Sequence, residues 1–444
     1  MSGGVIVQEA RCRGCAKCIK SCPTEALRVS EGLVRIIPEL CIDCGECVRV
    51  CREKAIQLYE DDWQLLRAQK NLVLMADPTF YVQVGAYARP ALMKEALQSS
   101  GIEDLTEYEA AAYDITAYAI AKLLETESRE RLPFISTYCP AVLRLIQINF
   151  PELVGRIVPV ESPLEIGVLL WKQKTGRDDP VTMAVPCPAK TTLVHAPEGR
   201  EKSTMSYSIS VRRLIRDILA GSPKVTGSLP AQPNRRWLHW SVSGGECRHI
   251  QAFSERPLTT ISVSGLRNTK DLLTELELGR LSGVDYIECR ACDLGCIGGV
   301  GTSESRFLSQ LRLDSIQFEW TPTDEERLAA ASRFESDVWR LEKPFTAKQR
   351  IPLAENLKEA MDKLRTMNAI FSELPHIDCG SCGRPSCRAL SEDIVRGHGE
   401  MTDCIFKLRE RIYGLSAEIH SLSGKIPHTF RSQVIHDHED QRFV

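Results

Sequence analysis

The sequence has no apolar run that approaches the roughly 18 consecutive residues of a membrane-spanning helix, and the runs around Val73 and Leu169 are far shorter. An excess of one charge is also missing, because 56 basic and 59 acidic residues leave a net charge of −3, which does not favour nucleic-acid binding. Residues 1–8 lack the basic segment and apolar core of a signal peptide. We therefore expect a cytoplasmic protein with no membrane span and no nucleic-acid partner.

Nucleotide-binding motifs are absent as well. No Walker, Rossmann-type glycine or flavin motif occurs, so the chain would need a partner protein to use NAD. Hydrophobic residues make up 43% and charged residues 26% of the 444 positions, which is typical of a globular protein with about three domains. The unusual number is 18 cysteines. Disulfides are uncommon in a reducing cytosol, so metal ligation is the first hypothesis for them.

Two cysteine runs of identical spacing lie 29 residues apart: Cys12, Cys15, Cys18 and Cys22, then Cys41, Cys44, Cys47 and Cys51. Such runs hold [4Fe–4S] cubanes, and the fourth cysteine of each run usually ligates the other cluster. We therefore expect one cluster on Cys12, Cys15, Cys18 and Cys51, and a second on Cys41, Cys44, Cys47 and Cys22. Zinc knuckles are the alternative, but they use separate pairs of cysteines. Residues 1–60 resemble a bacterial two-cluster ferredoxin, with Arg52 where the first repeat has Pro23.

A third group of cysteines lies near the C-terminus: Cys379, Cys382, Cys387 and Cys404. Gly380, Gly383 and Pro385 supply tight turns, and residues 389–397 are expected to form a short helix that returns the chain to Cys404. The group resembles the single-cubane domain of corrinoid iron–sulfur and electron-transport proteins. A zinc ribbon is the alternative.

The middle of the chain alternates between strand and helix patterns. Strands are expected at residues 72–76, 80–84, 134–137 and 183–185, and helices at 108–125 and 141–149. Cysteines follow two of these strands. This is the pattern of an α/β domain that places its chemistry at the carboxyl ends of its strands. Residues 197–231 are rich in charge, Ser, Pro and Gly, and are expected to be a surface insertion.

Three peptides carry a family resemblance: residues 136–140, 185–190 and 288–299. Together they resemble the signature peptides of the [FeFe]-hydrogenase catalytic domain, in which a cubane is bridged to a diiron unit to form the H-cluster. The resemblance implies cubane ligation by Cys139, Cys187, Cys292 and Cys296, with Cys296 as the bridge. It also implies a hydrogen bond from Lys190 to a cyanide ligand. Pro186, Gly298 and Gly299 are expected to line the cofactor, the glycines because they allow the backbone to approach it.

The departures from the family concern proton transfer. Tyr138 stands where active members have a proton-shuttling cysteine, and a phenol is a poor shuttle near pH 7. The positions of the usual relay carry Ala119 to Lys122 and Val158. We expect Glu246 and Glu288 to replace the relay; the alternative is that they cap a helix or pair with Arg248 or Arg290. Cys247 and Cys289 are expected to be small buried residues rather than ligands.

The sequence thus predicts a slow hydrogenase-type oxidoreductase, with H2-sensing as one possible role, which exchanges electrons with ferredoxin or another redox protein. The alternative is a non-catalytic electron-transfer or assembly protein with a cubane but no diiron unit. A stripe of Ile and Leu from Ile405 to Leu422 has the heptad spacing of a two-stranded coiled coil and predicts a homodimer or a signalling partner. Packing of this stripe on its own domain is the alternative.

The expected fold class is α/β for the hydrogenase-like domain, with a small α+β ferredoxin-like domain before it and a small iron–sulfur domain with a terminal helix after it. The corresponding boundaries are residues 1–62, 68–345 and 350–410, a helix at 405–425 and a tail at 426–444.

Overall fold

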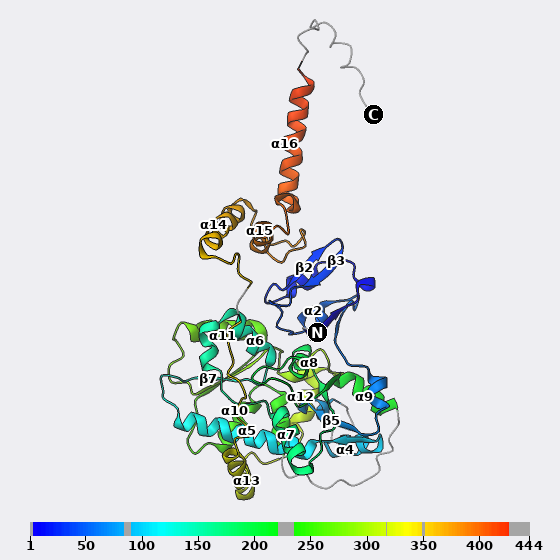
Figure 1. Ribbon diagram of the computed structural model, residues 1–444, viewed down its shortest axis with the longest axis vertical. Coiled ribbons are helices and arrows are strands. Elements are labelled where there is room, and N and C mark those ends of the chain that lie inside the picture. Colours follow the sequence, from blue (N-terminus) through cyan, green and yellow to red (C-terminus); the bar gives the residue numbers. More distant parts are fainter. Residues whose placement is uncertain (1–2, 84–89, 221–234, 317, 349–350, 426–444) are drawn as a thin grey trace. The chain divides into compact units, whose positions relative to one another are not determined.

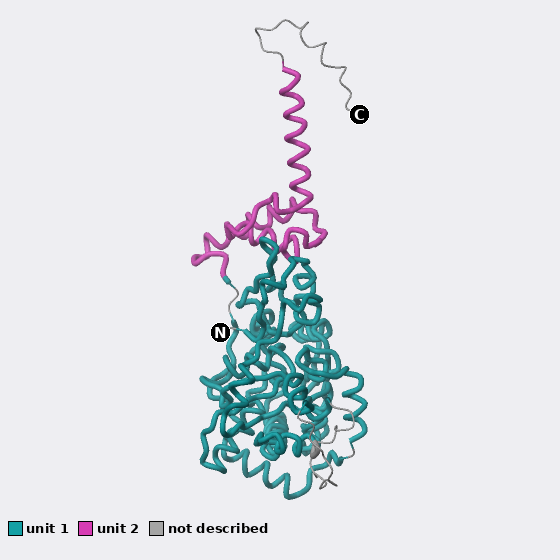
Figure 2. The backbone as a smooth tube through the Cα atoms, turned by 90° about the vertical axis from the view of Figure 1, so that its right-hand side faces the viewer, with its two compact units in different colours: residues 1–351 teal, residues 352–444 magenta. Residues whose placement is uncertain are grey.

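The computed structural model describes residues 3–83, 90–220, 235–316, 318–348 and 351–425. The chain divides into two compact units, residues 1–351 and 352–444 (Figure 2). The first unit contains both the N-terminal ferredoxin-like segment and the α/β region, and the second contains the last cysteine group. The predicted tail at 426–444 lies outside the described residues.

The N-terminal segment is built from short elements: β1 (Val5–Val7), α1 (Lys17–Ser21), β2 (Leu27–Ser30), β3 (Leu33–Ile36), α2 (Glu46–Val50) and β4 (Ile56–Leu58). Strand β1 pairs antiparallel with β4, and β2 with β3. The sequence repeat is also a repeat of backbone conformation. The left-handed residues Gly14, Ala16 and Glu25 recur 29 positions later as Asp43, Gly45 and Lys54.

Two parallel sheets form the α/β region (Figure 1). The first has the order β6-β5-β8-β9 and comprises β5 (Leu72–Ala76), β6 (Ile102–Asp104), β8 (Val181–Val185) and β9 (Tyr207–Ser210). The second has the order β10-β11-β7 and comprises β7 (Phe134–Ile135), β10 (Thr260–Ser264) and β11 (Tyr286–Arg290). Residues of β5, β8 and β11 are buried throughout, as expected for parallel strands covered on both faces.

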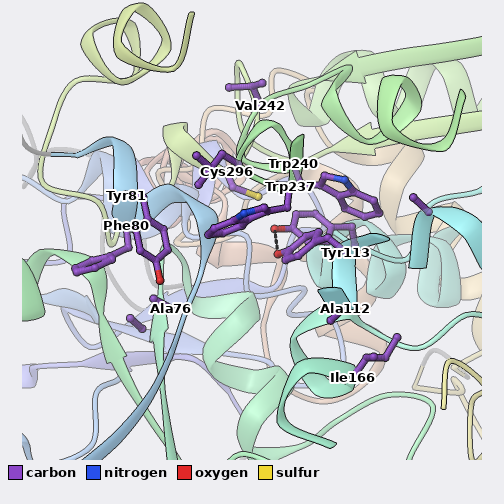
Figure 3. Packing of buried hydrophobic residues seen from close by; sticks show 14 of the residues in the cluster. Ala76, Phe80, Tyr81, Ala112, Tyr113, Ile166, Trp237, Trp240, Val242 and Cys296 are labelled. Atoms are coloured by element: carbon purple, nitrogen blue, oxygen red, sulfur yellow. Dashed lines mark hydrogen bonds between the residues drawn. The ribbon is translucent and has the colours of Figure 1, made fainter. Parts of the chain in front are cut away.

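Helices pack around these sheets, and the expected helices at 108–125 and 141–149 are both present. The helices are α3 (Trp63–Arg67), α4 (Pro90–Ser99), α5 (Thr106–Thr126), α6 (Pro140–Asn149), α7 (Pro163–Thr175), α8 (Pro188–His195), α9 (Val211–Ala220), α10 (Gly245–Phe253), α11 (Leu266–Glu277), α12 (Arg306–Asp314) and α13 (Asp324–Glu335). Short 3-10 helices connect them: η1 (Glu9–Arg11), η2 (Pro78–Val82), η3 (Pro151–Arg156), η4 (Arg236–Ser241) and η5 (Cys296–Gly298). One core cluster joins residues of β5, α5, α9, η4 and α10, and its Tyr113, Trp237 and Trp240 rings lie near Cys296 (Figure 3).

The expected α/β class is confirmed, with a small ferredoxin-like region before it and a small helical region after it, but two expected segments are wrong. Where a strand was predicted at 80–84, the structure has the 3-10 helix η2. Residue 84, the last of the predicted strand, lies outside the described residues. Asp77 accepts a hydrogen bond from the Thr79 amide at 3.0 Å and Pro78 fills the first helical position, so the chain turns into a helix directly after β5.

The surface insertion predicted at 197–231 is wrong for its central part. Residues 207–210 form β9, which pairs with β8, and α9 follows directly. Ile209, Val211 and Leu214 are fully buried. Charged and polar residues on the outer face of α9 raise the polarity of the whole segment and hide this apolar face. Residues 221–231 lie outside the described residues.

The second unit contains α14 (Leu357–Glu373), α15 (Cys387–Val395), a 3-10 helix η6 (Met401–Asp403) and α16 (Ile405–Ser423). Leu374, Leu390, Cys387 and Cys404 form its small core. Helix α16 extends beyond this core (Figure 2). Its stripe of Ile and Leu side chains is between 42% (Leu408) and 66% (Ile419) exposed, so the alternative, packing of the stripe on its own domain, is not observed. Among the described helices, none combines the length and apolar character that a membrane crossing requires.

Candidate metal centre

The three signature peptides converge because each follows a parallel strand. Cys139 lies between β7 and α6, Cys187 between β8 and α8, and Cys292 and Cys296 follow β11. All four cysteines line one cavity with an empty volume of about 370 Å³. Pro140 and Pro188 each occupy the first turn of the helix that follows, and these helix N-termini favour negative charge on Cys139 and Cys187.

The thiols of this cavity are strongly shielded from water. Burial and, to a lesser extent, the charges of Cys296 and Cys139 raise the pKa of Cys187 to about 12. Burial also raises the pKa of Cys296 to about 11, against the opposing effect of Lys190. Without metal, Cys187 and Cys296 are therefore protonated near neutral pH, and a metal that binds them must release their protons.

The donor set fits a cluster better than a single ion. Within the described ranges, no three His, Cys, Asp or Glu side chains are grouped closely enough to hold one metal ion. The four thiols instead border a common cavity, which is the arrangement that a cubane with one thiolate per iron requires. Arg290 also lines this cavity, and its buried Nη1 has no hydrogen-bond partner among the described residues. It is a donor that a cluster sulfide would satisfy.

Gly298 and Gly299 were expected to let the backbone approach the cofactor, and the structure shows that they are required by backbone packing. A Cβ atom at Gly299 would lie 2.3 Å from the carbonyl oxygen of Pro186, and one at Gly298 would lie 2.5 Å from that of Asp293. The glycines therefore let two backbone segments pack on each other. Gly299 also lines the cavity, but it is the neighbouring backbone that excludes a side chain.

Lys190 has a protein partner in this structure. Its Nζ forms an ion pair with Asp77 Oδ2, and both side chains are buried. The same Nζ lies 3.8 Å from the ring centroid of Tyr138. The guanidinium carbon of Arg290 lies 4.3 Å from the same ring centroid. Two cations thus contact one aromatic ring, an arrangement that is favourable when the groups are desolvated.

Tyr138 itself is held in the core. Its hydroxyl lies 2.9 Å from that of Tyr113, the bond drawn in Figure 3. Burial raises the pKa of the Tyr138 phenol well above its usual value, and the charge of Asp77 adds to the rise. The phenol therefore keeps its proton near neutral pH.

The two predicted relay carboxylates occupy different environments. Glu246 accepts hydrogen bonds from Ser136 at 2.8 Å and Tyr286 at 2.7 Å, and burial raises its pKa to about 7 against the effect of Arg290. Glu288 accepts from the amides of Gly244 and Cys247 at the start of α10. Both carboxylates pair with Arg290. Both carboxylates thus make the arginine contact of the structural alternative, and Glu288 also caps the start of α10.

The positions of the usual relay are apolar and buried except for Lys122, which is half-buried and pairs with Glu125 and Glu255. Ala119, Ile120 and Ala121 lie in the core on α5, and Val158 is fully buried. Cys247 and Cys289 are buried as well, and Cys247 Sγ accepts a hydrogen bond from Ser262 at 3.3 Å.

A second cavity, of about 350 Å³, is lined by Cys41, Cys44, Cys47 and Cys22. These four cysteines are the set expected for one N-terminal cluster, including the crossover residue Cys22. Cys12, Cys18 and Cys51 share one apolar cluster. Burial raises the pKa of Cys18 to about 11, and the charges of Cys15 and Cys12 contribute to the rise. Cys44 lines both this cavity and the central one, so the two cavities share a wall.

Asp43 ties this loop to the α/β region. Its buried carboxylate accepts hydrogen bonds from the Gly4 amide at 3.1 Å, Thr192 on α8 at 2.9 Å and Arg144 on α6 at 2.7 Å. Arg49 adds a hydrogen bond to the carbonyl of Gly298 at 2.7 Å.

The last group is only partly enclosed. Cys387 and Cys404 are buried, Cys382 packs against them, and Cys379 is exposed. Asp378 accepts a hydrogen bond from the Cys387 amide at 2.6 Å, which holds the loop before α15 against the start of that helix.

Sequence reasoning missed Asp77, Asp43 and the central place of Arg290. The only available signal for Asp77 was a charged residue directly after an apolar strand, a position that often carries function in α/β proteins.

Three family models match the chain. Residues 70–222 and 242–300 match "Iron only hydrogenase large subunit, C-terminal domain", residues 4–52 match "4Fe-4S dicluster domain", and residues 374–406 match "Putative Fe-S cluster". The chain is an iron–sulfur protein related to the [FeFe]-hydrogenases. No curated protein matches this chain.

Solved structures give distant matches. One is the structure of HydA(deltaEFG), which is described as revealing stepwise [FeFe]-hydrogenase H-cluster assembly. It has 14% identity to this chain and a TM-score of 0.47, and the match covers 66% of this chain and 97% of that one. A variant of [FeFe]-hydrogenase HydA1 from Chlamydomonas reinhardtii has 14% identity, a TM-score of 0.47, and coverage of 64% and 98%.

Proposed function

We propose that the protein is a hydrogenase-type oxidoreductase that oxidises H2 or reduces protons slowly and exchanges electrons with ferredoxin or another redox protein. In this proposal Cys139, Cys187, Cys292 and Cys296 hold a cubane, with Cys296 as the bridge to a diiron unit. The diiron unit would supply the metal site at which H2 is split or formed. Glu246 and Glu288 are the proposed proton carriers, and a role in H2 sensing is compatible with slow turnover.

The observation that carries the proposal is the wall shared by the two cavities. Cys44 belongs to the proposed N-terminal ligand set Cys22, Cys41, Cys44 and Cys47, and it also borders the central cavity. Electron transfer weakens steeply with distance, so adjacent clusters would exchange electrons readily. The second N-terminal cluster, on Cys12, Cys15, Cys18 and Cys51, would extend this route, and a cubane on Cys379, Cys382, Cys387 and Cys404 would be a fourth centre.

Slow turnover follows from the state of Tyr138. Its phenol is fully buried and its raised pKa keeps it protonated, so it does not exchange protons near neutral pH as a thiol would. General acid–base groups typically contribute about 10²–10⁴-fold to a rate, and a site without its usual shuttle should lose a factor of that order. If Glu246→Gln and Glu288→Gln both leave turnover unchanged, their proposed role is wrong.

A second candidate is an electron-transfer protein with the cubane alone. It is favoured by the ion pair between Lys190 and Asp77, because a cyanide ligand would have to share or displace the partner that Lys190 already has.

Infrared spectroscopy separates the two candidates. After anaerobic cluster loading and treatment with a diiron donor, the hydrogenase proposal expects carbonyl and cyanide bands in the wild type and their absence in Cys296→Ala. Cys247→Ala is the matched control, because Cys247 is a buried cysteine outside the proposed ligand sets. Wild-type protein with a full complement of cubanes but no such bands would leave the second candidate.

The apolar face of α16 is the proposed contact for a second copy of the chain or a signalling partner. Ile405, Ile412 and Ile419 alternate with Leu408, Leu415 and Leu422, and all six are exposed. This is the pattern of a parallel two-stranded coil. Truncation after Lys407 should reduce the oligomeric state measured by light scattering. An unchanged mass together with unchanged partner binding would exclude α16 as an interface.

A further inference from the structure

Arg290 places a permanent positive charge beside the central cavity. It is the last residue of β11, two positions before the proposed ligand Cys292. The residue is only 1% exposed, and it lines the cavity that the four cysteines share. A guanidinium group stays protonated in proteins, so the charge of Arg290 is present at every pH at which the protein is folded. Lys190 is the other cation that lines this cavity, and it already pairs with Asp77.

Three contacts fix the orientation of the Arg290 guanidinium. Its Nη2 lies 2.8 Å from Glu246 Oε2, and its Nε donates a hydrogen bond to Glu288 Oε1 at 3.1 Å. Its central carbon lies 4.3 Å from the ring centroid of Tyr138. Both carboxylates are buried and are themselves held by other hydrogen bonds. The guanidinium therefore cannot turn away from the cavity without breaking two buried ion pairs.

One nitrogen of the guanidinium is left without an acceptor. Nη1 of Arg290 is buried, and it has no hydrogen-bond partner among the described residues, the four cysteines of the cavity included. A buried charged donor without an acceptor lowers stability. Because Nε and Nη2 face carboxylates, Nη1 is the nitrogen that can serve a group bound in the cavity. The acceptor that it lacks is expected there.

We propose that Arg290 Nη1 donates a hydrogen bond to an inorganic sulfide of the cubane on Cys139, Cys187, Cys292 and Cys296, and thereby makes this cubane easier to reduce. Hydrogen bonds to the sulfurs are among the factors that set the potential of an iron–sulfur cluster. A reduced cluster carries one more negative charge than the oxidised one, so a fixed cationic donor stabilises the reduced form more. The inference rests on the ligand set of the proposed function and requires neither a diiron unit nor turnover of H2.

Pulsed EPR detects the bond in protein that has its cubanes but no diiron unit. The protein is grown with arginine that carries ¹⁵N in its guanidinium group, and the signal of the reduced central cubane is the one that Cys187→Ala removes. This signal should show a ¹⁵N coupling that is lost in Arg290→Lys and kept in Arg236→Met. Arg236 is the matched control, because it is also buried and pairs with two carboxylates, those of Asp114 and Glu326, but does not line the cavity.

A redox titration measures the effect of the bond on the central cubane. At a given potential, Arg290→Lys should lower the ratio of reduced to oxidised cubane about tenfold, which is about 59 mV for one electron. This variant keeps the positive charge but not the planar fork of donors. Should it fail to bind iron, Arg290→Met together with Glu246→Gln and Glu288→Gln keeps the site neutral, and the double variant that retains Arg290 is its reference.

The outcomes separate the role of Arg290 from the proposed function. A central cubane without ¹⁵N coupling, or with the same potential in Arg290→Lys as in the wild type, would overturn the role of Arg290 and leave the proposed function standing. If Cys187→Ala removes no signal, the ligand set and the role of Arg290 are both wrong. Coupling in protein that never turns over H2 after treatment with a diiron donor would contradict the hydrogenase proposal and leave the bond intact.

Discussion

Replacement of Asp43 by alanine should loosen the N-terminal segment from the α/β region. The change leaves Arg144 buried without its closest partner, and removing one member of a buried ion pair costs about 3–5 kcal/mol. Glu198 Oε1 remains 3.7 Å from Arg144 Nε, so the lower value of about 3 kcal/mol is the better figure. At about 1.4 kcal/mol per factor of ten, the opened state should become about 100-fold more populated.

Native-state hydrogen exchange measures this opening. The amide of Asp61 donates to the carbonyl of Ser208 at 3.0 Å, so it is protected only while the two parts of the unit stay together. Asp43→Ala should accelerate its exchange by about 100-fold, and Asp43→Asn, which keeps the hydrogen-bond acceptor, should accelerate it less. Glu53→Ala is the control, because its pair with Arg13 is exposed and of little energetic value. If Asp43→Ala exchanges within about threefold of this control, the buried pair does not hold the segment.

Three further predictions concern other sites. Cys379→Ser should remove about four of the roughly 16 irons expected from four cubanes; unchanged iron in metal analysis would exclude the C-terminal site. Burial raises the pKa of Glu161 to about 7, so its contribution to stability is complete below its ordinary pKa of 4.5 and is lost as the pH rises through 7. Urea unfolding below and above pH 7 should show that the free energy of unfolding of the wild type falls with pH and that this fall is missing in Glu161→Gln. If the free energy of unfolding depends on pH equally in both proteins, the prediction is wrong. Tyr138→Phe should cost about 1 kcal/mol for the lost bond to Tyr113, and Tyr138→Ala about 3–5 kcal/mol; equal unfolding midpoints would show that the ring contributes little.

The grouping of cysteines around common cavities was predictable because it follows from their spacing in the sequence. Two runs of four cysteines placed Cys22 with the opposite run, and the structure gathers Cys22 into one cavity with Cys41, Cys44 and Cys47. The apolar run at 72–76 likewise indicated a buried strand. These signals are contained within a few neighbouring residues.

Contacts between distant segments were not predictable in this way. The pairing of Lys190 with Asp77 depends on β5 and β8 being neighbours, although the two residues are 113 positions apart. The 3-10 helix at Pro78 replaced an expected strand because one capping carboxylate and one proline outweighed an apolar run. The segment at 207–220 is polar on average, and its few apolar residues became interpretable only once β9 was seen to pair with β8.

The shared wall between the two cavities has a consequence for how this protein can evolve. Cys44 borders the central cavity, and Gly45 packs so closely that a Cβ there would lie 2.8 Å from Val300 and 3.2 Å from Pro188. The loop at 41–47 is therefore under two constraints at once, its own cluster spacing and the shape of a neighbouring site. A ferredoxin module from another source would satisfy the first constraint and not the second. Recombination should exchange this module only together with the surfaces of α6 and α8 on which it rests.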